Sequence, residues 1–325
     1  MISLKEITRP ILDDLNNFQI EFKSALNSEV KLINSISSYL VKNRGKNIRP
    51  ILTLLSARLC GSPTRHTYKA AAMMELLHVA TLIHDDIVDD AKLRRGKPSV
   101  KHIWKNKISV LMGDFILSKA LINMVNLKNF DALELISNTA EKLSAGEIMQ
   151  IEKSLTRNMP KDVYYEMINK KTASLIAASC ELGAITTTNE AKDKKSVFGY
   201  GENLGMAFQI KDDLFDFLGS ENQTGKDVGG DVKQNMITLP LIYSIDNADR
   251  SSRNRLKSLV RKKKKSRADL KEINDMINEL GGFDYTNKKL DDFSNEAINS
   301  ISGYDESDIK TSLINLVHFN KDRKS

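Results

Sequence analysis

The stretch ELLHVATLIHDDIVDDAKLRRG, residues 75–96, organises the fold and the chemistry of this chain. Apolar residues recur at helical spacing from Leu76 to Ile87, which predicts a helix with one buried face. Asp85 and Asp89 lie four residues apart and therefore project from the same side of that helix. Their like charges repel each other and are unfavourable at a helix C-terminus. A cation must compensate them, and Mg²⁺ is the natural candidate because it takes carboxylate, water and phosphate oxygens.

A second acidic cluster repeats this spacing. Residues 208–217 read FQIKDDLFDF and place Asp212, Asp213 and Asp216 in another segment of helical periodicity. An isolated DDxxD motif is as often a solvated acidic patch as a metal site. Two copies, each beside an apolar face, favour carboxylates that face one another across a cavity and hold metal ions.

Basic residues accompany both acidic clusters. They are Lys46 and Arg49 in the loop GKNIRP, Arg94 and Arg95 after the first cluster, Lys170 and Lys171 in an apolar helix, and Lys226 after the second cluster. Arginine binds phosphate as a planar fork and lysine binds it as a mobile point charge. Any one of these groups alone is most simply surface charge. Together with two DDxxD motifs they indicate diphosphate ligands.

The composition is that of a globular protein, because 41% of the 325 residues are hydrophobic and 28% are charged. No apolar run approaches the roughly 20 residues that span a bilayer, and the N-terminus lacks the layout of a signal peptide. We therefore expect a cytoplasmic protein. Cys60 and Cys180 show no metal-ligand spacing and are expected to be buried, reduced thiols. The basic run 261–265 is expected to be a solvated loop or helix end, and no nucleic-acid partner is expected.

Helices are expected along nearly the whole chain. Only six prolines and sixteen glycines occur, and no segment alternates as a strand would. We predict one domain over residues 1–325, an all-α bundle of long, mostly antiparallel helices. The predicted helices span residues 12–26, 28–41, 51–60, 68–89, 108–127, 131–152, 161–182, 190–218 and 239–244, with shorter pieces from residue 252 onward.

These motifs resemble, in order, those of the all-trans polyprenyl diphosphate synthase family. The resemblance runs from about Gly45 to Tyr243 and rests on GKNIRP, both aspartate motifs, RRG, VLMGDFILS, GEIMQI, NKKTASLIAASCELGA and TGKDVGGDV…TLPLIY. It implies the isoprenoid synthase fold, with helices around a deep central cavity, and usually a homodimer. The implied reaction condenses isopentenyl diphosphate with an allylic diphosphate of the farnesyl or geranylgeranyl type in repeated trans additions. It requires Mg²⁺, with three ions expected beside the bound diphosphate.

The resemblance also implies roles for individual residues. The metal-bridged allylic site takes Asp85, Asp86, Asp89, Asp212, Asp213 and Asp216, with Asp85, Asp89 and Asp212 as the expected direct metal ligands. The residues expected to contact the allylic diphosphate are Arg94, Lys171, Thr172, Gln209 and Lys226. Those expected to hold isopentenyl diphosphate are Lys46, Arg49, His78 and Arg95. The expected catalytic set is Asp85, Asp86, Asp89, Arg94, Lys171, Asp212 and Lys226.

One position departs from the family pattern. Met236 stands where the family commonly has a lysine shortly before TLP. Lys233 is a candidate substitute. The departure suggests weaker allylic binding or a different substrate requirement.

The residues one turn before the first aspartates bear on product length. Ala80 and Thr81 are both small, whereas short-chain members of the family commonly carry a bulky aromatic residue at this level. We therefore expect a product of about C30 to C40 that grows down an apolar tunnel along this helix. The expected tunnel floor is the helix 108–127, through Phe115, Leu121, Met124 and Leu127. The apolar product allows peripheral contact with a membrane.

Two alternatives stay open. A terpene cyclase of the same fold also ionises a diphosphate, but it normally carries a different second metal motif and lacks the isopentenyl diphosphate residues. A non-catalytic subunit of a heteromeric prenyl synthase tends to lose its aspartates, whereas both motifs are complete here, and only Met236 supports that alternative. The sequence does not separate homodimer from heteromer, although apolar helix faces near residues 108–135 offer an interface.

Overall fold

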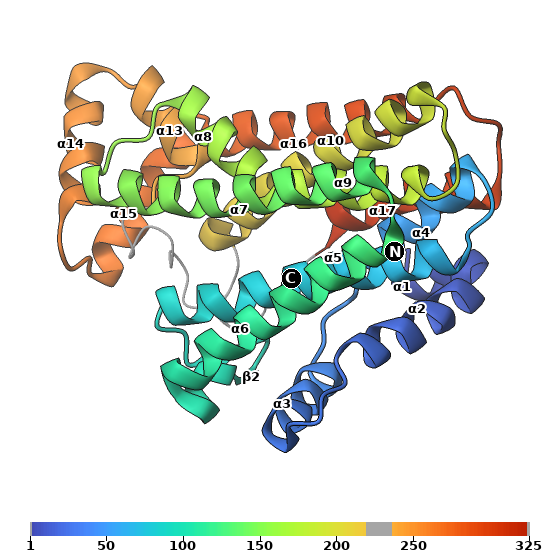
Figure 1. Ribbon diagram of the computed structural model, residues 1–325. Coiled ribbons are helices and arrows are strands. Elements are labelled where there is room, and N and C mark those ends of the chain that lie inside the picture. The colour runs from blue at the N-terminus through green and yellow to red at the C-terminus, as the bar shows by residue number, and fades with distance from the viewer. Residues whose placement is uncertain (1, 219–235, 324–325) are drawn as a thin grey trace.

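The computed structural model describes residues 2–218 and 236–323, and these residues are almost entirely helical (Figure 1). In chain order the elements are α1 (Leu4–Thr8), the 3₁₀ turn η1 (Arg9–Ile11), α2 (Leu12–Ala25), α3 (Lys31–Lys42), α4 (Ile48–Cys60), α5 (Arg65–Val88), β1 (Leu93–Arg94), β2 (Lys97–Pro98), α6 (Val100–Leu127), α7 (Phe130–Thr156), α8 (Lys161–Ile168), the π turn η2 (Asn169–Ala173), α9 (Ser174–Ile185), α10 (Ala191–Leu218), α13 (Leu239–Asn247), α14 (Arg250–Arg261), α15 (Arg267–Glu279), α16 (Gly282–Ser300) and α17 (Asp308–Asp322). Within the described ranges the only strands are β1 and β2, which pair antiparallel. The prediction of an all-α fold is confirmed.

Two predicted helices differ from the observed elements by more than a small shift of their ends. The segment predicted as one helix over 161–182 consists of α8 and α9 joined by the π turn η2. Helical periodicity does not reveal this turn, because its one extra residue only rotates the apolar pattern. The helix predicted from residue 108 begins at Val100, where the Ser99 hydroxyl accepts a hydrogen bond from the His102 amide. It is kinked at Lys105, whose φ is 67°.

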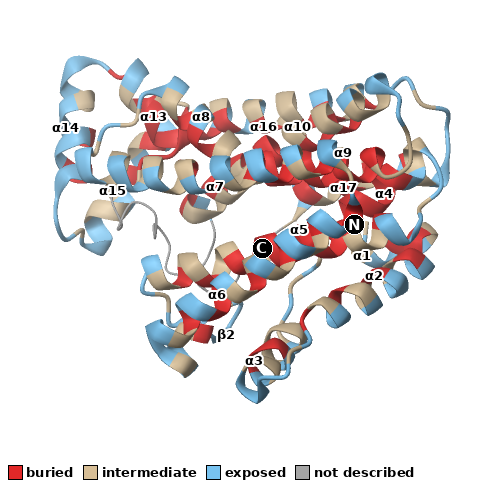
Figure 2. Cartoon of the chain, viewed as in Figure 1, coloured by how far each residue is buried: buried red, intermediate tan, exposed pale blue. Residues whose placement is uncertain are grey.

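Helix α9 lies at the centre of the bundle. It packs extensively against both α4 and α10, and α5 and α7 also contact it. Nearly every residue of α9 is buried, as expected for a helix that is apolar on all sides. Figure 2 shows buried residues on α4 and α9 and mostly exposed residues on α14. Cys180 of α9 is buried and Cys60 at the end of α4 is half-buried, and both are free thiols.

Three apolar clusters fill the space between the helices. The first joins the N-terminal helices α1 to α5 to α9, α10 and α17. The second joins α8 and α10 to the C-terminal helices α13 to α16. The third lies between α5, α6, α7 and α9. Because α10 contributes to the first and second clusters and α5 to the first and third, these two long helices are held firmly where each carries an aspartate motif.

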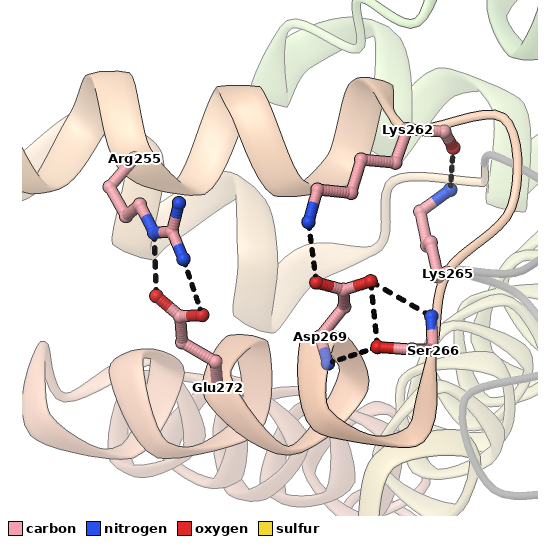
Figure 3. A network of polar contacts seen from close by, with 6 residues as sticks. All are labelled: Arg255, Lys262, Lys265, Ser266, Asp269 and Glu272. Carbon is pink, nitrogen blue, oxygen red and sulfur yellow. Dashed lines mark hydrogen bonds and ion pairs between the residues drawn. The ribbon is translucent and has the colours of Figure 1, made fainter.

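The basic run 261–265 ends α14 and forms the loop to α15, so the prediction of a helix end or loop is confirmed (Figure 3). Lys262 pairs with Asp269 of α15 at 2.6 Å. Lys265 donates to the main-chain oxygen of Lys262 at 3.1 Å. About two helical turns before Lys262, Arg255 forms a forked pair with Glu272 at 2.6 and 2.7 Å. These exposed contacts join α14 to α15 and each contributes less than about 1 kcal/mol.

Helix α6 corrects one expectation. By length and composition it is apolar enough to cross a membrane, because an 18-residue window reaches a mean hydropathy of 1.6, with 33% of that window buried. The prediction that no apolar run approaches the length of a membrane span was wrong, because at most two charged residues interrupt this 18-residue window. Core helices of soluble proteins pass the same test, and α6 packs along α5. Exposed apolar side chains occur on α6 and α7, and we call them together the α6–α7 face: Val110, Leu111, Leu121, Ile122, Val125, Phe130, Ile148, Ile151 and Leu155.

Candidate active site

The first aspartate motif ends α5. Asp86 is buried and accepts a hydrogen bond from Arg94 Nε at 2.7 Å. Asp85 is half-buried, and Asp89 is the exposed C-cap of the helix. The middle aspartate is therefore held by the protein, while the outer two lie nearer the solvent.

The two outer aspartates share one electrostatic environment. The pKa of Asp85 is raised to about 6, mainly by burial and in addition by the negative charges of Glu147 and Asp89. The pKa of Asp89 is raised by burial and by Glu147. Lys171 and Arg94 act in the opposite direction on both groups. A set of carboxylates with surplus negative charge fits a hard divalent cation, which prefers oxygen ligands.

Lys171 comes from the π turn η2, between α8 and α9. Its Nζ forms an ion pair with Glu147 of α7 at 2.5 Å and donates to Gln150 at 2.9 Å. Glu147 and Gln150 are three residues apart and therefore lie on the same side of α7. Lys171 is thus fixed by α7 at a position where its charge acts on the first aspartate motif.

Two glycines let neighbouring helices approach this π turn closely. A Cβ atom on Gly146 of α7 would lie 2.8 Å from the Lys171 amide nitrogen. A Cβ atom on Gly205 of α10 would lie 2.5 Å from the Ala173 Cα. Larger residues would push α7 or α10 away from the turn. Single π turns occur often at functional sites, and this one carries Lys171 and Thr172.

The second aspartate motif lies on α10 and is bound to the same turn. Thr172 Oγ1 donates to Gln209 Oε1 at 2.7 Å, and Gln209 Nε2 donates to Asp213 Oδ1 at 2.9 Å. The Tyr164 hydroxyl donates to Asp213 Oδ2 at 2.6 Å. Asp213 is buried, as Asp86 is in the first motif. In both motifs the second of the paired aspartates is held inside the protein.

Asp212 is paired with the C-terminal end of the chain. Its Oδ1 lies 2.7 Å from Arg323 Nη2. Arg323 follows α17, donates to the Phe208 main-chain oxygen at 2.9 Å and lies over the Phe208 ring at 4.0 Å. Arg323, the last described residue of the chain, therefore contacts both Phe208 and Asp212 of the segment that carries the second motif.

The two motifs are linked through η2, since Lys171 acts on Asp85 and the adjacent Thr172 bonds to Gln209. Over residues 2–218 and 236–323, no three carboxylate, imidazole or thiol groups lie close enough to hold an ion by themselves. Mg²⁺ is usually held by one or two carboxylates together with water and phosphate oxygens, so its binding does not require three protein ligands. That both motifs share metal ions stays a prediction.

A basic cavity of about 440 Å³ lies beside the first motif. Lys46, Arg49, His78 and Arg95, predicted to share one site, all line it. Arg94 does not, because its side chain turns to Asp86. The two adjacent arginines therefore point to different places, Arg94 to the first aspartate motif and Arg95 to the cavity, and their roles in substrate binding stay predictions.

The cavity carries a net positive charge. Arg49 is half-buried, and desolvation lowers its pKa to about 10, so it stays protonated at neutral pH. Glu75 is the acidic residue of the lining, and burial raises its pKa against the opposing charges of Arg49 and Arg95. Burial and the nearby arginines lower the pKa of His78, which keeps its imidazole neutral. With Lys46 and Arg44 also present, the lining suits an anionic ligand.

The loop before α4 and the residue Arg95 beside it have unusual backbone conformations where they line the cavity. Asn47, the N-cap of α4, has φ 53° in the left-handed region. A Cβ atom on Gly45 would overlap the Arg95 guanidinium, so only glycine allows Arg95 to lie against the loop. Arg95 itself has φ 53°. Left-handed residues of this kind are held by their surroundings and gather at functional sites.

The residues expected to set the product length lie on α5 and α6. Ala80 is buried in the first apolar cluster, and the Thr81 hydroxyl bonds to the His78 main-chain oxygen at 2.9 Å. Met124 and Leu127 of α6 are buried in the third cluster, below this level of α5. Leu121 is 46% exposed, so its expected place in the tunnel floor was wrong for the single chain, because it faces outward.

Three positions singled out in the sequence follow the second aspartate motif along the chain. Lys226 and Lys233 lie outside the described residues. Met236 is half-buried directly before the buried Ile237 and Thr238 that lead into α13. The role of Lys226 and the effect of Met236 therefore stay predictions.

Sequence reasoning missed several residues of both sites. Glu147 and Gln150 were within the quoted segment GEIMQI, and their spacing on one helix side was the available signal. Tyr164, Asn320 and Arg323 gave no signal, because their partners lie on elements far away in the sequence.

The comparisons with known proteins agree with this geometry. A family model described as Polyprenyl synthetase matches residues 30–277. Heptaprenyl diphosphate synthase component 2 of Geobacillus stearothermophilus is 37% identical over 76% of this chain and 77% of its own length. Octaprenyl diphosphate synthase of Escherichia coli is 30% identical over 98% of both chains. The crystal structure of a polyprenyl synthase from Caulobacter crescentus, complexed with calcium and isoprenyl diphosphate, superimposes with a TM-score of 0.91 at 31% identity, covering 99% of this chain and 98% of that one.

Proposed function

Because this chain belongs to the polyprenyl synthetase family and is a polyprenyl diphosphate synthase, we propose that it adds isopentenyl diphosphate repeatedly to an allylic diphosphate such as farnesyl or geranylgeranyl diphosphate. The observation that supports this proposal most is that the side chains of Arg94 and Arg95 lie in two different places. Arg94 turns to the first aspartate motif and Arg95 lines the basic cavity. A reaction between two diphosphates requires two cationic sites side by side.

In the first step the allylic C–O bond breaks and the diphosphate takes the electron pair. Asp85, Asp89 and Asp212 would hold Mg²⁺, three ions in all, which when bound supply Lewis-acid stabilisation of the departing anion. Arg94 and Lys171 add positive charge at the same place, with Lys226 as a further proposed cation. Glu147 and Gln150 keep Lys171 in position before the substrate arrives. Thr172 and Gln209 keep Asp213 in position in the same way.

In the second step the double bond of isopentenyl diphosphate attacks the allylic carbon, a C–C bond forms, and a proton leaves to the departed diphosphate. Lys46, Arg49 and Arg95 would hold the diphosphate of isopentenyl diphosphate in the basic cavity. His78 would contribute a neutral hydrogen bond, since its pKa is depressed. The apolar residues Phe208 and Leu204 of the lining exclude water from the reacting carbons.

We propose a product of about C30 to C40. Upstream of Ala80 on α5 come Leu77, Met74 and Met73, which pack with Met124 and Leu127 in the third apolar cluster. The flexible, unbranched methionines can rearrange around a growing chain. Small residues at Ala80 and Thr81 leave the first turn open, so the first bulky obstacle is deeper.

We propose a homodimer through the α6–α7 face, acting in the cytoplasm as one domain over residues 1–325. The exposed apolar side chains of that face support it, because a stable monomer rarely leaves so many uncovered. The name of the Geobacillus relative, component 2, makes a heteromer the alternative. The apolar product tail would allow peripheral contact with a membrane.

The test is the product spectrum from purified protein with labelled isopentenyl diphosphate, farnesyl diphosphate and Mg²⁺. We expect products of C30 or longer, and a loss of at least about 10³-fold in rate for Asp85→Ala. The matched control is Asp90→Ala, since Asp90 is exposed and pairs with Lys101 outside the motif. A folded parent that elongates nothing with Mg²⁺ present would refute the proposal and favour a cyclase or a subunit that needs a partner.

A further inference from the structure

The C-terminal helix α17 supplies one wall of the basic cavity. Leu316, Phe319, Asn320 and Arg323 line it together with the loop before α4. Lys46 Nζ lies 5.5 Å from the centre of the Phe319 ring, which places this end of α17 directly against the loop. None of the four residues was expected to take part in substrate binding.

Asn320 stands out among them because it is a buried polar group without a partner. Its side chain is 4% exposed, and neither Nδ2 nor Oδ1 forms a hydrogen bond with the described residues. An amide buried in this way is unfavourable, and nearly all buried polar groups in folded proteins are bonded. A structural reason for an asparagine here is therefore missing, since an apolar side chain of the same size would be less costly.

Further unpartnered atoms occur at the same cavity. Arg49 Nε and Arg323 Nε are buried without a hydrogen bond among the described residues, and both side chains line the cavity. Three donors left unused around one basic cavity indicate a ligand with several acceptor oxygens. A diphosphate has such oxygens and also matches the positive charge.

We propose that Asn320 is a substrate-binding residue whose Nδ2–H donates a hydrogen bond to a diphosphate oxygen of isopentenyl diphosphate. The inference rests on the proposed function of the cavity. A neutral donor adds direction without adding charge to a site that already holds Lys46, Arg49 and Arg95. Asn320 would therefore tune the affinity for isopentenyl diphosphate and leave the allylic site unaffected.

The test compares Asn320→Leu, which keeps the volume and removes the amide, with Asn315→Leu on the same helix outside the cavity lining. For Asn320→Leu we expect the KM for isopentenyl diphosphate to rise about tenfold, as for the loss of one hydrogen bond to a charged group. The KM for farnesyl diphosphate should stay within about twofold, and the melting temperature of the free protein should not fall. Asn315→Leu should change neither KM.

Direct binding separates this inference from the proposed function. Calorimetric titration of isopentenyl diphosphate into protein in EDTA should show about tenfold weaker binding for Asn320→Leu and for Asn320→Ala. Unchanged affinity in either folded variant would overturn the role of Asn320, even if the parent elongates normally. A parent that binds isopentenyl diphosphate but elongates nothing would refute the proposed function and leave Asn320 to be decided by the titration.

Discussion

The two aspartate motifs share a spacing but are stabilised differently. In α5 the buried Asp86 is held by a charged donor, Arg94, only eight residues away. In α10 the buried Asp213 is held by two neutral donors, Tyr164 and Gln209, of which Tyr164 lies 49 residues away on another helix. The first motif is thus largely a local structure, while the second depends on the packing of α8 against α10.

The outer aspartates differ as well. Asp85 lies beside Glu147 and carries surplus negative charge, whereas Asp212 already pairs with Arg323. The first motif therefore needs an added cation more than the second does. Equal spacing in the sequence does not mean equal electrostatics, because the neighbours of each motif come from different helices.

The largest expected difference is in stability. Asp213→Ala removes the acceptor of two donors in a buried network and should lower the free energy of unfolding by about 2 to 3 kcal/mol. Asp86→Ala should cost only about 1 kcal/mol, because Arg94 is 34% exposed and can be hydrated, and because burial raises the pKa of Asp86. Urea denaturation of both variants in EDTA measures the difference. Equal costs would mean that the two networks are equivalent after all.

The raised pKa of Asp85 predicts that the stability of the metal-free protein depends on pH. Its pKa of about 6 in the folded protein exceeds that of an unfolded aspartate, so the folded state binds the proton more tightly. Between pH 4 and 6 the metal-free protein should lose stability as the pH rises, by about 2 kcal/mol at most.

Asp85→Asn should remove this loss of stability between pH 4 and 6. Thermal unfolding of the parent and the variant in EDTA across that pH range measures the difference. In the parent, the Mg²⁺ concentration needed for activity should increase below pH 6, because protons compete for Asp85. A slope that is identical in Asp85→Asn would show that another group titrates there.

The smallest expected effect concerns Arg323. Because Asp212 is 41% exposed, Arg323→Gln should lower the free energy of unfolding by no more than about 1 kcal/mol. It should also make Mn²⁺ bind a few-fold more tightly, measured by electron paramagnetic resonance without diphosphate, because the competing cation is gone. Arg255→Gln in the α14–α15 network is the matched control and should leave Mn²⁺ binding unchanged. Weaker Mn²⁺ binding in Arg323→Gln would show that the pair does not compete with the ion.

Sequence reasoning succeeded where an interaction is local. Helical periodicity located α5 and α10, and the i, i+4 spacing placed Asp85 and Asp89 in one environment. The adjacent Arg94 and Arg95, expected from the family resemblance to contact different diphosphates, do point to different places, while their roles stay predictions. Sequence reasoning failed at the π turn, because one extra residue in a turn does not change the periodic pattern. It also underestimated the apolarity of α6, because the few charged residues in that helix hide how apolar the remainder is.

By itself the sequence determined that this protein is a helical bundle with two acidic motifs and basic residues close to them in the chain, because each of these features lies within a few turns of one helix. Only the tertiary structure decided which of those carboxylates are held inside the protein and which lie nearer the solvent. It also brought Asn320 and Arg323 from the end of the chain to sites built by α4, α5 and α10. The physical reason is that periodicity tells which side of a helix is apolar but not which other helix will cover it.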